Sequence, residues 1–436
     1  MIDLSTSKTP KANTVLPHYI FAALSFCVLC LLLVFSSEAL VGHYFHPKLL
    51  AITHIAALGW GTMIIFGALY QFLPVILETS LYSERLSKIT FFIFGIGIIC
   101  IAFAFWNFYV GLQLQIAAVL ILTAFILFSA NIILTAFKVS DWSIEAEFIV
   151  TSVFWLLLTG ILGLLMVFNF TYPFLPKSHL LFLKIHAHLG IAGWFVLLIM
   201  GVGSKLIPMF LLAQNLNKKK LKYAYYLVNL GLIGFCADVF LREDKAWIIL
   251  YAIIIVAGII SFGTFLFEAF KKRLRKQLDI GLKHSFTAFL SLILPIISAG
   301  VICFFSSAEN KFILQIYLTY GASIFFGFIS SLILGQTFKT LPFIVWLNLH
   351  KKQNGKLKTL LPKDLYSEKL VNLQFVLFLL ALPVLIGGIL LAQFLIIKTG
   401  AILLLATAVV YNINVFKILF HSCKPPETYE PVQQRQ

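Results

Sequence analysis

The chain has 436 residues, of which 61% are hydrophobic and only 11% are charged, and its mean hydropathy is +0.98. This composition excludes a soluble globular domain and is typical of a polytopic membrane protein. The net charge of +16 does not indicate nucleic-acid binding, because the basic residues lie in short loops between apolar runs, where such residues orient helices and contact anionic lipid.

Twelve apolar runs are candidates for membrane-spanning helices, each of which needs about 20 residues. In chain order they are residues 18–41, 49–76, 87–109, 112–138, 144–170, 180–211, 222–241, 245–270, 283–306, 311–345, 370–397 and 400–421. No soluble domain is predicted, so residues 1–436 form a single transmembrane domain. The polar N-terminus has no small-residue cleavage site, and we expect no cleaved signal peptide.

One stretch of the second run is repeated along the chain. Residues 54–74 read HIAALGWGTMIIFGALYQFLP, and 134 residues later residues 188–208 read HLGIAGWFVLLIMGVGSKLIP without a gap. A further 134 residues on, 322–342 read ASIFFGFISSLILGQTFKTLP, in which Ala322 takes the place of the first His. A gapless period of this kind indicates internal repetition.

The period predicts an all-α integral membrane protein of twelve transmembrane helices, arranged as three pseudo-equivalent four-helix repeats. The repeats cover about residues 18–138, 144–271 and 283–421. Most of the 33 Lys and Arg residues lie in the termini and the even-numbered loops, among them Lys8, the Lys351–Lys369 cluster, Lys424 and Arg435. By the positive-inside rule both termini are cytoplasmic, and we predict a location in a bacterial inner membrane.

Three histidines are candidate ligands because they lie inside apolar helices. With both termini cytoplasmic, His54 falls near the outer end of the second helix, and His186 and His188 near the outer end of the sixth. An ionisable residue there is costly and is usually turned inward and partnered, and neutral imidazole binds heme iron, copper or zinc. Because His54 and His188 occupy the same place in the 134-residue period, a ligand shared by these two is favoured. Positions i and i+2 lie about 200° apart on a helix, so at most one of His186 and His188 meets His54 directly. The alternative is that all three only form hydrogen bonds within the bundle.

Other polar residues in the runs receive structural interpretations. His18 and His284, on the cytoplasmic side, are interpreted as interfacial or loop histidines. Lys205 and Lys339 each precede a proline by three residues, shallow enough for their ammonium groups to reach the inner membrane surface. Asp238 is expected to pair with a nearby basic residue, Arg242.

Twelve helices, cytoplasmic termini, threefold repetition and histidines at the outer ends of helices two and six resemble the catalytic subunit of heme-copper oxidases and its nitric oxide reductase relatives, over nearly the whole chain. In that family helix two supplies an axial ligand of the low-spin heme, which matches His54, and helix six supplies a copper ligand, which matches His186 or His188. The resemblance implies heme b as the first cofactor and copper as the alternative. It also implies an oxidoreductase-like role in electron transfer or with a diatomic gas, beside respiratory-type subunits or an electron donor in the lipid bilayer.

The chain departs from the family pattern at two places. Residues 311–345 contain no His, although the family's helix ten supplies two heme ligands, and the family's adjacent His pair is missing between Leu216 and Leu241. We therefore predict that complete oxygen or nitric oxide reduction is absent. Two further readings remain open: a membrane carrier that handles copper or heme, and a degenerate homologue that binds no cofactor.

Overall fold

The computed structural model describes residues 9–305, 310–352 and 361–421, and within these ranges it consists of helices without strands. Twelve of the described helices are long and apolar enough to cross a membrane, which confirms the predicted number and makes the chain a polytopic integral membrane protein in architecture. Of the residues used for orientation, Lys8, Lys424, Arg435 and part of the Lys351–Lys369 cluster lie outside the described residues.

The spans are of two kinds. Single helices form most of them: α2 (Ala12–Phe35), α5 (Glu84–Trp106), α6 (Leu112–Ala136), α7 (Ile144–Asn169), α10 (Lys219–Leu241), α11 (Lys245–Lys271), α16 (Glu368–Leu390) and α17 (Phe394–Leu419). Consecutive segments form the others: α3 (Pro47–His54), η2 (Ile55–Thr62) and α4 (Met63–Ile76); α8 (His179–His188), η3 (Leu189–Val196) and α9 (Leu197–Leu211); α12 (Ile280–Ser291) and α13 (Ile293–Phe305); α14 (Lys311–Ala322), η4 (Ser323–Ile329) and α15 (Ser330–Lys352). Two short 3-10 helices, η1 (Ser37–Val41) and η5 (Pro362–Leu365), lie in loops.

Polar capping residues set the beginnings of many of these helices. Each accepts a hydrogen bond from a backbone N–H two or three residues further along, which satisfies one of the donors that a helix start leaves free. The capping residues are Ser83, Ser143, Ser178, Asp244, Asp279, Asn310 and Ser367. The apolar runs therefore give the lengths of the spans, and short polar residues between them fix where several begin.

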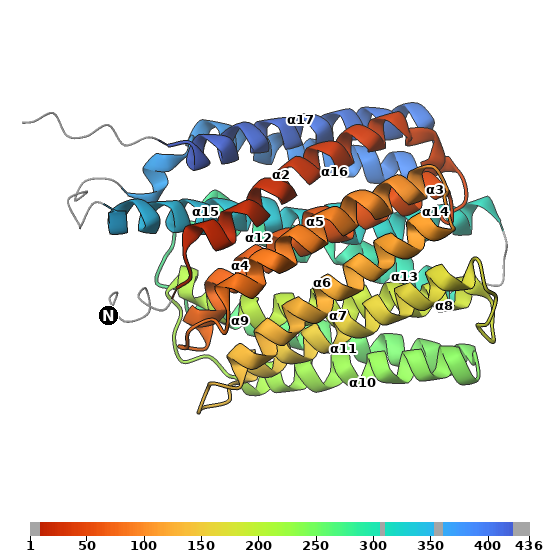
Figure 1. Cartoon of the computed structure of the whole chain (residues 1–436), viewed down its shortest axis with the longest axis horizontal. Coiled ribbons are helices and arrows are strands. Elements are labelled where there is room, and N and C mark those ends of the chain that lie inside the picture. Colours follow the sequence, from red (N-terminus) through yellow and green to blue (C-terminus); the bar gives the residue numbers. More distant parts are fainter. Residues whose placement is uncertain (1–8, 306–309, 353–360, 422–436) are drawn as a thin grey trace, which may run out of the picture.

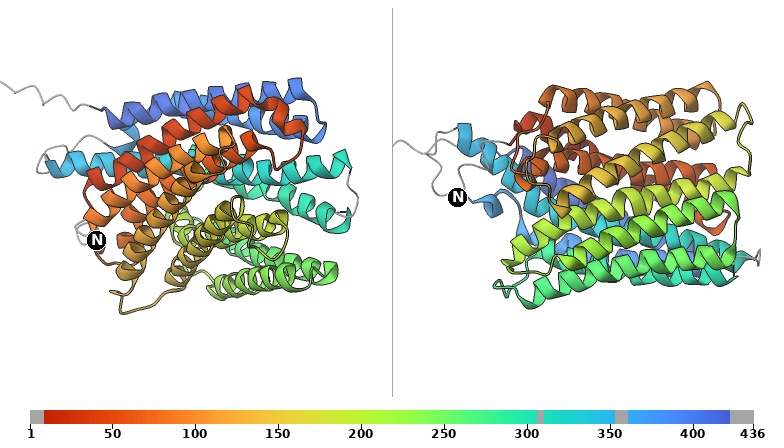
Figure 2. Two further views of the ribbon diagram at one scale, coloured as in Figure 1. Left: turned by 45° about the vertical axis from the view of Figure 1, so that its right-hand side comes forward. Right: turned by 90° about the horizontal axis from the view of Figure 1, so that it is seen from below.

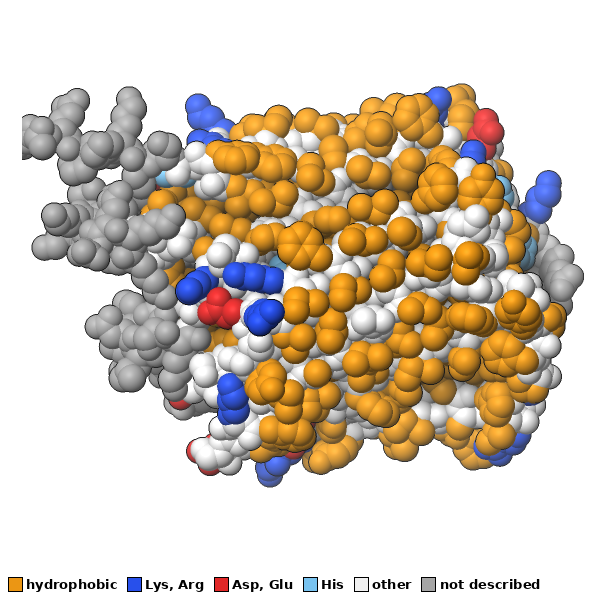
Figure 3. All heavy atoms as spheres, in the orientation of Figure 1, with side chains coloured by type: hydrophobic (Ala, Val, Ile, Leu, Met, Phe, Trp, Pro, Cys, Tyr) orange, Lys and Arg blue, Asp and Glu red, His pale blue; other side chains and the backbone are white. Residues whose placement is uncertain are grey.

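The helices run roughly along one axis, and α2 begins at the same end of the bundle at which α17 ends (Figures 1 and 2). Apolar side chains cover the middle of the face in Figure 3, and charged side chains gather towards its two ends. The composite spans that contain η2, η3 and η4 are the most deeply buried of the twelve. They form the core of the bundle, and the other spans surround them.

Each of these three core spans contains a π-helical segment at the same place in the 134-residue period. η2, η3 and η4 begin one residue after His54, His188 and Ala322, respectively. A π-helical turn closes its hydrogen bonds over one more residue than an α-helical turn and is frequent at functional sites. The candidate histidines therefore lie immediately before an irregularity of the helix.

The first predicted helix, 18–41, is wrong at both ends, because the structure places α2 at Ala12–Phe35. Pro17 lies within the helix instead of marking its start. The helix ends early because the Ser37 hydroxyl donates to the carbonyls of Leu33 and Val34, an alternative to the helical pattern that serine favours.

The boundary between the last two spans, predicted at residues 398–399, is also wrong. α16 ends at Leu390 and α17 begins at Phe394, and Ala392 in the turn has a φ of 51°. Gly400, the first residue of the last predicted span, lies inside α17, where a Cβ atom would collide with Leu385 on α16. This glycine serves close helix packing rather than a turn.

Candidate functional site

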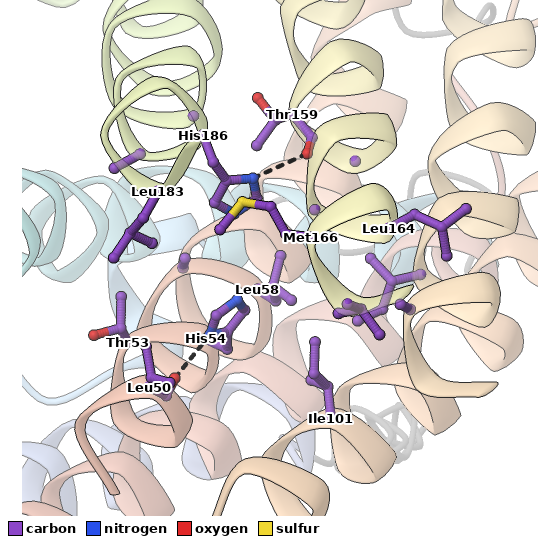
Figure 4. Close-up of a pocket in the computed structure, with 18 of the residues that line it drawn as sticks. Leu50, Thr53, His54, Leu58, Ile101, Thr159, Leu164, Met166, Leu183 and His186 are labelled. Carbon is purple, nitrogen blue, oxygen red and sulfur yellow. Dashed lines mark hydrogen bonds between the residues drawn. The ribbon is translucent and has the colours of Figure 1, made fainter. Parts of the chain in front are cut away.

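Two of the candidate histidines face the same pocket. His54 at the end of α3 and His186 in α8 line an apolar pocket of about 200 Å3, whose other walls come largely from α5, α6 and α7. Figure 4 shows the two imidazoles on opposite sides of this pocket. Their ring centroids are 6.5 Å apart and their planes are inclined by 26°.

Backbone carbonyls fix the orientation of both rings. Nδ1 of His54 lies 2.7 Å from the carbonyl oxygen of Leu50, and Nδ1 of His186 lies 3.1 Å from that of Thr159. A carbonyl can only accept, so each Nδ1 carries the proton and each Nε2 carries a lone pair. Neither Nε2 has a hydrogen-bond partner among the residues that the structure describes. This tautomer is the one found when a histidine binds a metal through Nε2.

α7 forms the wall beside His186 with residues spaced at about one helical turn. Thr159 holds the ring, and a Cβ atom on Gly163 would lie 2.9 Å from Cε1 of His186, so a glycine is needed there for the ring to fit. Met166 lines the same pocket (Figure 4). The sequence analysis missed these three residues, although the pair Gly160 and Gly163 in an apolar helix is a signal of close approach.

The spacing of the two rings fits two imidazoles on one metal. With each nitrogen about 2 Å from the ion and each ring centre about 1 Å further, the centroids would lie about 6 Å apart. The observed distance is 6.5 Å. The volume of about 200 Å3 is below the roughly 300 Å3 at which ligand pockets usually begin. A porphyrin therefore requires side chains of the lining to turn aside, whereas a single ion does not. Among the described residues, no three or more His, Cys, Asp or Glu side chains form a metal-binding group.

His188 does not share this pocket. Its Nδ1 lies 2.8 Å from the carbonyl oxygen of Lys184, and its Nε2 lies 3.3 Å from the hydroxyl of Tyr320 on α14. Its ring also packs against Phe235 on α10. The structure thus brings His54 and His186 together and places His188 at a different helix contact.

The interpretation of His18 and His284 as interfacial or loop histidines is wrong, because both side chains are fully buried. α2 and α12 begin earlier than predicted, which places these residues within the helices. His284 lies 3.3 Å from both Ser331 and Gln374, and His18 packs against aromatic rings.

The other polar residues that the sequence singled out, Asp238, Lys205 and Lys339, either form ion pairs or are exposed. Asp238 forms the expected ion pair with Arg242, at 3.2 Å. Lys339 lies 2.7 Å from a carboxylate oxygen of Asp279, with only 10% of its side chain exposed, whereas Lys205 is exposed. Lys339 therefore has a structural partner, which the sequence analysis did not predict.

No protein-family model matches this chain, and no curated protein matches it significantly. The candidate site is therefore assigned from its geometry.

Proposed function

We propose that this chain is an integral membrane protein that binds a heme between His54 and His186 and uses it to carry single electrons. One observation carries the proposal: two imidazoles from neighbouring helices face each other across an apolar pocket with 6.5 Å between their ring centroids. Backbone carbonyls hold both Nδ1 atoms, which leaves both Nε2 atoms for a metal.

When bound, the heme would supply one-electron oxidation and reduction. His54 and His186 would hold the heme iron through their Nε2 atoms, which are the two candidate ligand atoms that face the pocket. The carbonyls of Leu50 and Thr159 keep the rings in place and make both ligands more basic. The apolar lining excludes water and so adjusts the reduction potential. These residues favour electron transfer over gas binding or reduction.

We further propose that the chain is a divergent relative of the heme-copper oxidase catalytic subunit, built from three pseudo-equivalent four-helix units. The spacing of η2, η3 and η4 supports this. A second support comes from two buried tryptophans. Nε1 of Trp194 donates to Thr62 at 3.1 Å, and Nε1 of Trp60 donates to Ser330 at 3.0 Å. Trp60 and Trp194 lie one 134-residue period apart, and Thr62 and Ser330 lie two periods apart. The two hydrogen bonds therefore join the same two positions of the repeat, each time between different units.

Phe328 stands at the tryptophan position of the third unit, and Val196 stands at the hydroxyl position of the second unit. Both side chains are apolar and buried. The third pair of positions thus has neither a donor nor an acceptor, which agrees with a threefold arrangement in which these two positions are in contact. Gly67, Gly201 and Gly335 add a third support. At each of them a Cβ atom would collide with the preceding span, on α2, α7 and α12 respectively.

We propose that the end at which α2 begins is cytoplasmic, on the positive-inside rule, and that the membrane is a bacterial inner membrane. His54 and His186 then lie towards the outer surface. Phe45, Phe170 and His179 line the pocket on that side, and His179 packs against both phenylalanine rings. We expect the partner, an electron donor or a respiratory-type subunit, to approach over this aromatic cluster.

The test is a visible spectrum with heme and metal analysis of the full chain, purified after expression with added hemin. Wild-type protein is expected to show a Soret band and about one heme per chain. His54→Ala and His186→Ala should lose the band. His188→Ala is the matched control and should keep it, because His188 faces Tyr320 instead of the pocket. A colourless, metal-free wild-type protein, or equal loss in the control, would overturn the proposal.

Copper is the second candidate, and two observations favour it. The thioether of Met166 lines the same pocket, and the pocket volume of about 200 Å3 admits an ion without rearrangement. Imidazole and thioether are ligands that suit Cu(I). Stoichiometric copper without a Soret band would support this alternative, and Met166→Leu should then weaken copper binding while leaving the fold intact.

A further inference from the structure

A second cavity lies in the core of the bundle, nearer the end at which α2 begins. It has a volume of about 160 Å3, is lined mainly by α4, α9 and α15, and is partly open to the outside of the bundle. Leu69, Ile199 and Ile333 represent the three walls, one from each core span. The two cavities lie about one helical turn apart along the same span, because Phe195 lines the histidine pocket and Leu198 lines the second cavity.

The few polar side chains in the lining are nearly all satisfied by other protein groups. The hydroxyl of Tyr19 lies 3.0 Å from that of Thr340, and Thr337 donates to the carbonyl of Ile333 at 2.7 Å. Gln336 donates its amide to Ser285 on α12 at 2.7 Å. Its Oε1 is the one buried side-chain atom of the described lining without a partner.

A bound water needs two to four polar partners, and one free acceptor does not provide them. Apolar cavities of about 150 Å3 stay dry and bind benzene or xenon. We propose that this cavity is a binding site for a small uncharged apolar molecule, of the size and chemistry of xenon or dioxygen. The membrane around the core spans supplies such molecules, because they partition into hydrocarbon. The inference does not depend on the ligand of His54 and His186.

Xenon is the probe for this site. Crystals of the full chain pressurised with xenon should show an anomalous peak between Leu69, Ile199 and Ile333. Ala68→Leu and Val202→Phe fill the cavity from two different walls, and each should remove the peak. Ala246→Leu is the control, because Ala246 is exposed on α11 and adds the same volume away from the cavity; it should keep the peak.

Loss of the peak in either folded filling variant, with retention in the control, supports the site. Two variants from different helices keep the test decisive if one of them does not fold. The proposal is overturned if the wild-type protein shows no peak there, or if the cavity holds ordered water or an elongated lipid chain. A peak that survives both filling variants overturns it as well.

Discussion

The hydrogen bond between Trp194 and Thr62 offers a test of the three-unit arrangement by a double-mutant cycle. Both side chains are 1% exposed, and Nε1 of Trp194 lies 3.1 Å from the acceptor. Phe328 and Val196 stand at the corresponding places elsewhere in the period. The double variant Trp194→Phe with Thr62→Val would therefore give this pair the side chains that the chain already uses at equivalent places.

Each single substitution leaves a buried polar group without its partner, at a cost of about 1–3 kcal/mol. Trp194→Phe also removes volume from the core, which adds to its cost. The double-mutant cycle removes the contribution of this lost volume, because the same volume is lost in the single Trp194→Phe variant and in the double variant. Hydrogen bonds between membrane helices average about 0.6 kcal/mol and reach about 1.7 kcal/mol. We expect the double variant to be more stable than the sum of the single effects by about 1 kcal/mol.

The assay is unfolding of the purified chain in mixed detergent micelles, followed by circular dichroism for the wild type, both single variants and the double variant. Trp194→Phe combined with Thr123→Val is the control, because Thr123 bonds its own helix at the carbonyl of Val119. The control pair should be additive within about 0.5 kcal/mol. Additivity of the Trp194 and Thr62 substitutions to the same degree would refute the reasoning.

Two further predictions concern single residues with matched controls. Lys339→Met should lower the free energy of unfolding by about 1 kcal/mol, because it removes the 2.7 Å ion pair with Asp279, whose carboxylate then keeps only Arg275 at 3.4 Å as an ion-pair partner. Lys205→Met, at an exposed place, should change it by less than about 0.5 kcal/mol in the same thermal or detergent unfolding assay; equal effects would contradict the role of the pair. Gly163→Ala should weaken cofactor binding at least about tenfold in a heme or metal titration, because its methyl group displaces the ring of His186. Gly263→Ala, where nothing lies within 4 Å, should leave binding unchanged.

The number of spans could be predicted from the sequence, but several of their ends could not. Apolar runs of sufficient length are a direct consequence of the bilayer thickness, and all twelve are present in the structure. The ends depend on local hydrogen bonds and packing that composition does not reveal. Ser37 ends α2 by bonding back to Leu33, and α17 begins at Phe394, ahead of the predicted start at Gly400, which packs against Leu385.

The sequence singled out three candidate histidines, but it did not show which two of them lie together. His54 and His188 share one place in the period, which favoured a ligand shared by these two. The structure instead sets His54 opposite His186, and sets His188 against Tyr320. Helix geometry allows only one of His186 and His188 to meet His54, but the choice between them depends on the rotation of each helix, which the sequence does not show.

This pairing has a simple origin if the units are related by a rotation. Contacts around a rotation axis are heterologous, so a residue meets a different residue of the next unit and not its own equivalent. His186 and Tyr320 are 134 residues apart, and Ile52 is their counterpart in the first unit. His54 with His186, and His188 with Tyr320, are thus the same contact at two interfaces.

The third interface would pair Ala322 with Ile52, which can neither bind a metal nor form a side-chain hydrogen bond. The three equivalent contacts would then differ in their side chains. The first has two imidazoles beside a pocket, the second has an imidazole hydrogen-bonded to the Tyr320 hydroxyl, and the third has two apolar side chains. The first has both Nε2 atoms free, and the second has its only Nε2 engaged. Ligand chemistry is therefore expected at one interface, although the proposed threefold arrangement would give all three the same bundle geometry.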